Sequence, residues 1–78
     1  MKPILIVFFD DSPHSREVRS MLNSTGKMYN DNESIEDHLN PLRLYRLPVI
    51  VDTDGWVYEG HNDCMGFLRR ILRIQAGV

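Results

Sequence analysis

Cysteine is nearly absent from the sequence: Cys64 is the only one among 78 residues. The chain therefore has no disulfide of its own to support a core that is small at this length. His14, His38 and His61 do not complete any of the usual metal-ligand spacings with Cys64. We expect no metal site, and the lone cysteine indicates the reducing cytoplasm as the compartment.

Long hydrophobic runs are absent as well. The longest apolar run, Ile4–Phe9, has six residues, which is shorter than a signal-peptide core or a membrane span. We therefore expect no membrane contact and interpret this run as a buried strand. Hydrophobic residues make up 42% of the chain and charged residues 26%, which is typical of a single folded soluble domain, here residues 1–78.

The sequence also lacks a strong excess of one charge, since its formal net charge is −2. The basic residues do not form a stripe along the chain, although Arg69, Arg70 and Arg73 lie close together near its end. Nucleic-acid binding is therefore not favoured. We expect the three arginines to stabilise the negative end of a helix.

Four segments have the composition of strands. The first is rich in Ile, Val and Phe, which is typical of a fully buried strand, and a DTDG turn separates the last two. The expected strands are Pro3–Phe9, a short one at Lys27–Asn30, Leu47–Val51, and Trp56–Glu59.

The first helix has clear start and stop signals. Ser12 or Asp11 is a suitable N-cap, and Pro13 suits the first helical position. Gly26 marks the end of the pattern, so this helix is predicted to span about Pro13–Asn23.

Two further helices are predicted from apolar spacing. Asp31 or Asn32 caps the second, and Asn40–Pro41 either ends it or starts a further short helix. Its shared apolar face consists of Ile35, Leu39 and Leu42. Asn62 or Asp63 caps the last helix. Its apolar face consists of Met65, Leu68, Ile71 and Leu72, with Phe67 beside it.

The resulting order is β-α-β-α-β-β-α, which predicts the α/β class. A helix crosses over between the first two strands, so these should pair in parallel, whereas the last two should form an antiparallel hairpin. The expected architecture is a mixed four-stranded sheet flanked by three helices.

Three motifs in this order resemble the glutaredoxin branch of the thioredoxin superfamily, and most closely its small NrdH-redoxin type. SPHS at residues 12–15 follows the first strand, where the family has Cys-Pro-x-Cys or Cys-x-x-Cys. RLPVIV resembles the strand that opens with the family's cis-proline, here Pro48. WVYEGHND resembles the last strand, a glycine and a polar helix start. The resemblance covers nearly the whole chain and implies a glutaredoxin-like thioredoxin fold.

The resemblance also implies a role for each matched position. Ser12 holds the place of the attacking cysteine and Ser15 that of the resolving cysteine. The substrate-binding positions would be Pro13 and His14 between them, Leu47 and Pro48 along the groove, and Gly60, Asn62 and Asp63 where relatives bind glutathione or a partner.

The activity that the family implies is electron transfer to a protein disulfide, with ribonucleotide reductase as the typical client of the NrdH type. It needs no metal or organic cofactor, because reducing equivalents come from thioredoxin reductase or glutathione. Such domains are expected to be monomeric and cytoplasmic. Serine, however, cannot form a disulfide, and its alkoxide is not reached at neutral pH without a dedicated base.

We therefore expect this chain to have no dithiol redox activity. Two explanations of the serines stay open: both cysteines of an active enzyme were replaced, or the protein is a natural redox-inactive relative. In the second case it would be a binding module that uses the Pro48 groove and the helix N-terminus at Ser12 to hold an extended peptide or an anion.

Four further residues are candidates for a functional role: Cys64, His14, Trp56 and Tyr58. Cys64, in the first turn of the last helix, is either a reactive thiol or a packing residue, and packing is favoured. His14 is expected to be an exposed residue of a first helical turn. Trp56 and Tyr58 share one side of a strand, where packing beneath a helix is favoured over an exposed binding face.

Overall fold

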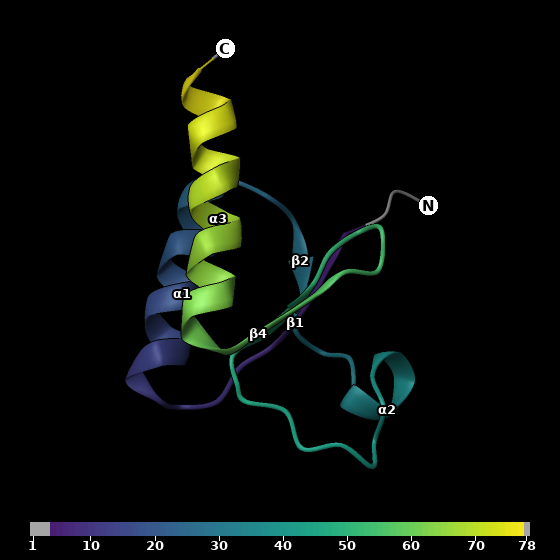
Figure 1. The fold of residues 1–78 in the computed structure, drawn as a ribbon. Coiled ribbons are helices and arrows are strands. Elements are labelled where there is room, and N and C mark those ends of the chain that lie inside the picture. Colours follow the sequence, from purple (N-terminus) through teal and green to yellow (C-terminus); the bar gives the residue numbers. More distant parts are fainter. Residues whose placement is uncertain (1–3, 78) are drawn as a thin grey trace.

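The computed structural model describes residues 4–77, in which four strands and three helices follow one another in the expected order (Figure 1). Pro3, the expected start of the first strand, lies outside the described residues. The strands are β1 (Leu5–Phe8), β2 (Tyr29–Asn30), β3 (Val49–Val51) and β4 (Val57–Glu59). The helices are α1 (Pro13–Thr25), α2 (Ile35–His38) and α3 (Gly60–Ala76).

The strands form one mixed sheet in the order β2-β1-β3-β4. Strand β1 is parallel to β2, with Leu5 opposite Tyr29, and antiparallel to β3, with Val7 opposite Ile50. Strands β3 and β4 are antiparallel, with Ile50 opposite Tyr58. The parallel first pair and the final hairpin were both predicted, and both are confirmed.

The sheet lies between two layers of helix. Helices α1 and α3 lie side by side on one face, and α2 lies on the other (Figure 1). Side chains alternate along the strands, so Val7 and Ile50 pack beneath α1 and α3, whereas Phe8 and Val49 pack on the opposite face with Leu39. Full burial of such a side chain stabilises the fold by about 1.5–3 kcal/mol.

Helix α1 begins as predicted and ends two residues later. The hydroxyl of Ser12, not the carboxylate of Asp11, caps it by accepting the N–H of Ser15 at 3.2 Å. At the other end, Thr25 Oγ1 donates to the carbonyl of Leu22 at 2.6 Å. Gly26 then stops the helix with φ of 71°, a left-handed conformation that favours glycine.

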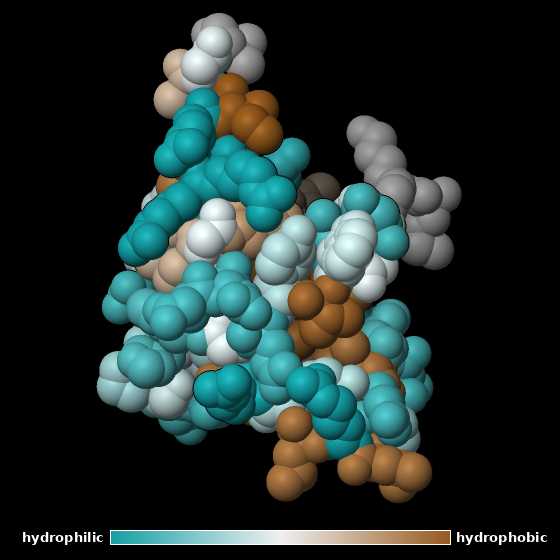
Figure 2. Space-filling view, viewed as in Figure 1, coloured by the Kyte–Doolittle hydropathy of each residue, from teal (hydrophilic) through white to brown (hydrophobic). Residues whose placement is uncertain are grey.

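The prediction for the second helix is wrong in its length and its cap. Helix α2 is a single turn capped at Ser34. The Asn40 main chain bonds to the hydroxyl of Tyr45 and to the N–H of Arg43, which fixes a turn in place of further helix. Leu42, expected on the packed face, is 93% exposed and Leu44 is 96% exposed. Figure 2 shows hydrophobic surface at the lower end, where this loop runs in Figure 1.

The last strand passes directly into the last helix, contrary to prediction. Helix α3 begins at Gly60, so Asn62 and Asp63 lie in its first turn instead of capping it. Gly60 has φ of 85°, which lets the chain turn from strand to helix within one residue. Its N–H lies 3.1 Å from the carbonyl of Arg46 and 2.9 Å from that of Pro48, which ties the start of the helix to the segment before β3.

Candidate functional site

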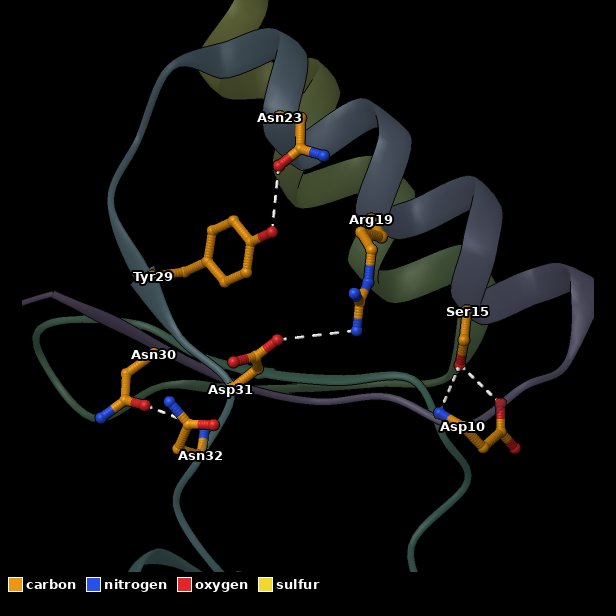
Figure 3. Close-up of polar contacts among 8 residues, drawn as sticks. All are labelled: Asp10, Ser15, Arg19, Asn23, Tyr29, Asn30, Asp31 and Asn32. Atoms are coloured by element: carbon orange, nitrogen blue, oxygen red, sulfur yellow. Dashed lines mark hydrogen bonds and ion pairs between the residues drawn. The ribbon is translucent and has the colours of Figure 1, made fainter.

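The two serines of the SPHS motif are both bound to Asp10, which follows β1. The Ser15 hydroxyl donates to Asp10 Oδ1 at 2.7 Å and accepts the Asp10 N–H at 3.1 Å (Figure 3). The hydroxyl of Ser12 donates to the same carboxylate oxygen, and the Ser12 N–H donates to it at 3.0 Å. One carboxylate thus accepts a hydrogen bond from both hydroxyls.

These hydrogen bonds keep the Asp10 carboxylate charged. The Ser12 hydroxyl, followed by the Ser15 hydroxyl, lowers the pKa of Asp10 from 3.8 to about 2. A carboxylate with so low a pKa is a weak base and does not activate either serine as a nucleophile. Ser15 is in addition only 1% exposed. Both serines thus donate to a carboxylate that is too weak a base to deprotonate them readily.

Asp10 was missed as a partner of the serines. Asp11 was one of the two expected caps of α1, but it is exposed and does not cap the helix. An aspartate two residues before a serine is a local signal that could have indicated the bond, because Asp side chains commonly accept the N–H two residues on.

A polar groove lies beside the first turns of α1 and α3. It has a volume of about 490 Å³. Its walls include five of the nine positions that the sequence predicted for the site, namely His14, Leu47, Gly60, Asn62 and Asp63. Three lining residues were missed: Arg46, Glu59 and His61. The other predicted positions, Ser12, Pro13, Ser15 and Pro48, do not line it.

Pro48 is fully buried, and its peptide bond with Leu47 is cis. The Pro48 carbonyl is occupied within the chain by the N–H of Gly60 and by Cys64 Sγ, which lies 3.4 Å away. Leu47 is the residue of this pair that faces the groove, and it is half-buried. Within residues 4–77 the main-chain N–H and C=O of Leu47 form no hydrogen bond.

Glu59 anchors one wall of the groove. Its carboxylate accepts the Arg46 N–H at 2.8 Å and contacts Arg43 Nη2 at 2.7 Å. The Arg46 main-chain N–H and then the Arg43 guanidinium lower the pKa of Glu59. The negative charge of this residue is thus neutralised inside the chain, whereas no ion pair involves Arg46 or Asp63 within residues 4–77.

Two stacked histidines also line the groove. The rings of His14 and His61 lie 4.5 Å apart at 27°. His61 Nε2 lies 3.1 Å from Oε1 of Glu17, a residue of α1, and this contact holds the His61 ring in place. His14 is exposed on the first helical turn, as predicted. The groove therefore combines two imidazoles, a guanidinium, an amide and two carboxylates around the open main chain of Leu47.

Cys64 is a packing residue. It is 0% exposed, and Sγ lies 3.4 Å from the carbonyl oxygens of Pro48 and Tyr58. Burial raises the pKa of its thiol to about 12. The packing interpretation is confirmed, and the thiolate that a nucleophile requires is disfavoured.

Trp56 and Tyr58 of the last hairpin differ in their packing. Tyr58 stacks on Phe67 of α3 with ring centroids 4.3 Å apart, as the packing interpretation predicted. Trp56 precedes β4 and is 68% exposed, contrary to that interpretation. The side chain of Trp56 is thus left on the surface at the hairpin.

Among residues 4–77 no group of three His, Cys, Asp or Glu side chains is arranged to hold a metal ion. None of the helices in that part is both long and apolar enough to cross a membrane. Compared with protein-family models, curated proteins and solved structures, the chain has no match in any of the three.

Proposed function

We propose that the chain is a glutaredoxin-like thioredoxin-fold domain that binds a partner segment and carries out no thiol–disulfide exchange. The order of its elements, the mixed four-stranded sheet and the position of SPHS at the start of α1 support the fold. Five predicted site positions around one groove support a binding site. The proposed compartment is the cytoplasm, where a lone thiol stays reduced.

The observation that carries this proposal is the bonding of Ser12 and Ser15 to Asp10. Thiol–disulfide exchange requires a thiolate, and a carboxylate at hydrogen-bond distance opposes a second negative charge. Hydroxyls suit this carboxylate because they donate to it and stay neutral. This favours a natural redox-inactive relative over an active enzyme whose two cysteines were replaced.

The groove suits an extended polypeptide. The free N–H and C=O of Leu47 can pair with the main chain of a segment laid along it, as an added strand would. The flanking Arg46, His61 and Asn62 then contact its side chains. Main-chain pairing gives affinity without demanding one sequence, while the polar walls select among segments.

Selection from a library of phage-displayed peptides of about six residues, the ordinary length of a strand, tests the binding role. We expect enriched peptides to shift the amide resonances of residues 14, 46–47 and 60–63 in ¹⁵N-labelled protein. His14→Ala removes one wall of the groove and should weaken binding by about tenfold, which is about 1.4 kcal/mol. Enriched peptides that leave all these resonances unmoved would refute the groove as the site.

A further inference from the structure

Strand β4 forms an open edge of the sheet. Its ladder with β3 includes a bond from the Asp52 N–H to the Trp56 carbonyl at 2.8 Å and one from the Gly60 N–H to the Pro48 carbonyl at 2.9 Å. Residues of an antiparallel strand alternate between facing their neighbour and facing away. The N–H and C=O of Val57 therefore point away from β3, on a side where no strand of residues 4–77 pairs.

This edge also exposes apolar side chains. Trp56 is 68% exposed and Val57 41% exposed. Figure 2 shows hydrophobic surface near the centre of this face, where β4 runs in Figure 1, with hydrophilic side chains around it. Edge strands are usually protected by charge, proline or a covering segment, so an open apolar edge favours a partner strand.

Three arginines lie on α3, and one of them, Arg70, lies next to the edge. Arg69, Arg70 and Arg73 are all exposed, and none of them forms an ion pair within residues 4–77. Only Arg73 lies in the last turn of the helix. The expectation that all three stabilise its negative end therefore accounts for Arg73 alone, because that effect falls off within one turn.

A shallow hollow of about 480 Å³ connects the edge to Arg70. Val57 and Tyr58 line it from β4, and Gly66, Phe67 and Arg70 line it from α3. Asn62 and Asp63 complete the lining and are shared with the groove described above. The hollow thus has one carboxylate near the start of α3 and one unpaired guanidinium further along it.

We propose that β4 binds an acidic extended polypeptide as a fifth strand. Side chains of an added strand alternate between the two faces of the sheet. Those on the α3 side, the side of Tyr58, would meet Arg70, and those on the other side would lie beside Val57. The preferred segment therefore alternates acidic and apolar residues. A nucleic acid would meet the same arginines, but it has no peptide main chain to pair with Val57.

This interaction goes beyond the proposed function, because it needs neither the Leu47 main chain nor the two histidines. A short peptide of alternating glutamate and valine, about six residues long, serves as the probe. Trp56, the only tryptophan, reports binding through its emission, which should shift to shorter wavelength as the ring leaves water. We expect saturable binding that weakens as salt is raised.

Arg70→Glu should weaken binding of the glutamate–valine peptide by at least about tenfold. Arg16→Glu, which makes the same charge change on α1, should change the affinity by less than about twofold. Val57→Pro removes the outward N–H while the bonds of Trp56 and Gly60 to β3 remain. A probe methylated on alternate main-chain nitrogens tests the same pairing on the unaltered protein, in case Val57→Pro does not fold. Both changes should abolish binding.

Three results would overturn the proposal. A lysine–valine peptide could bind as tightly as the glutamate–valine peptide, the methylated probe could bind as well as the unmethylated one, or a short oligothymidylate could bind more tightly than either. Arg70 does not line the groove, so Arg70→Glu should leave the affinity for peptides selected on the groove unchanged. A negative result for the edge is therefore distinguishable from a negative result for the groove.

Discussion

At the scale of single residues, Asp10 determines what the SPHS motif can do. Its carboxylate accepts a hydrogen bond from each of the two serine hydroxyls. The importance of positions 12 and 15 could be predicted, because SPHS follows a buried strand and precedes a helix. Asp10 could have been recognised as the partner of Ser12 from its place two residues earlier, whereas its bond to Ser15 depends on how the chain turns at the end of β1.

The lowered pKa of Asp10 makes a contribution to stability that depends on pH. The pKa is 3.8 ordinarily and about 2 in the folded protein, so the contribution is present above about pH 4 and is lost as pH falls to about 2. Asp10→Asn should therefore be less stable than the parent at neutral pH. Urea titrations at a series of pH values should show the difference shrinking over this interval.

Asp11→Asn is the matched control, because Asp11 is exposed and forms no side-chain hydrogen bond within residues 4–77. The free energy of unfolding of Asp11→Asn should stay close to that of the parent across the same urea titrations. A constant difference between Asp10→Asn and the parent down to about pH 2 would contradict the account.

The Cys64 thiol should be inert in the folded protein. Burial raises its pKa to about 12, so the thiolate fraction at mildly alkaline pH is very small. An aromatic disulfide reagent should label the native chain slowly, at a rate limited by opening of the structure, and should label the guanidinium-unfolded chain at once. Rapid labelling of the native chain would show that Cys64 is accessible.

At the scale of elements, helices with strong local signals were predicted well. Ser12, Pro13 and Gly26 define α1 through capping and left-handed geometry, which are properties of the residues themselves. Helix α2 was predicted too long because its end depends on Tyr45, which lies five residues beyond Asn40 and bonds to its N–H at 3.2 Å. Apolar spacing cannot show that such a contact displaces Leu42 from the core.

Packing of α1 on the sheet should dominate the stability of the domain. Leu22 is 0% exposed in the core between α1, α3 and the sheet. Leu22→Ala should lower the free energy of unfolding by about 2–5 kcal/mol, a large part of the total for a domain of this size. Thermal and urea unfolding measure this loss.

Leu44→Ala deletes the same atoms from a side chain that is 96% exposed. Its effect should stay within about 0.5 kcal/mol. Similar losses at Leu22 and Leu44 would mean that the loop before β3 is packed and that the core is placed wrongly.

At the scale of the whole molecule, β4 ends at Glu59 and α3 begins at Gly60. This direct connection places two proposed binding surfaces next to each other. The first turn of α3 meets the segment around Leu47 to form the groove, and the same turn meets β4 to form the hollow at the sheet edge. The α/β class could be predicted from the order of the elements, and five of the eight groove residues from the resemblance of the motifs to a known family, whereas Arg46, Glu59 and His61 were missed. The exposure of Arg69, Arg70 and Arg73 on α3 could not be predicted, and neither could their lack of ion pairs within residues 4–77. Both depend on how the elements pack against one another.

Asp10 holds a serine site that we propose is unsuited to thiol–disulfide exchange. The most direct measurement is insulin-disulfide reduction by the chain, by Ser12→Cys/Ser15→Cys, and by that double variant with Asp10→Asn added. We predict no activity for the chain, slow turnover for the double variant, and faster turnover for the triple variant, since each pKa unit that the carboxylate adds lowers the thiolate fraction by about tenfold. Turnover by the chain itself, or a double variant as fast as the triple variant, would contradict the claim.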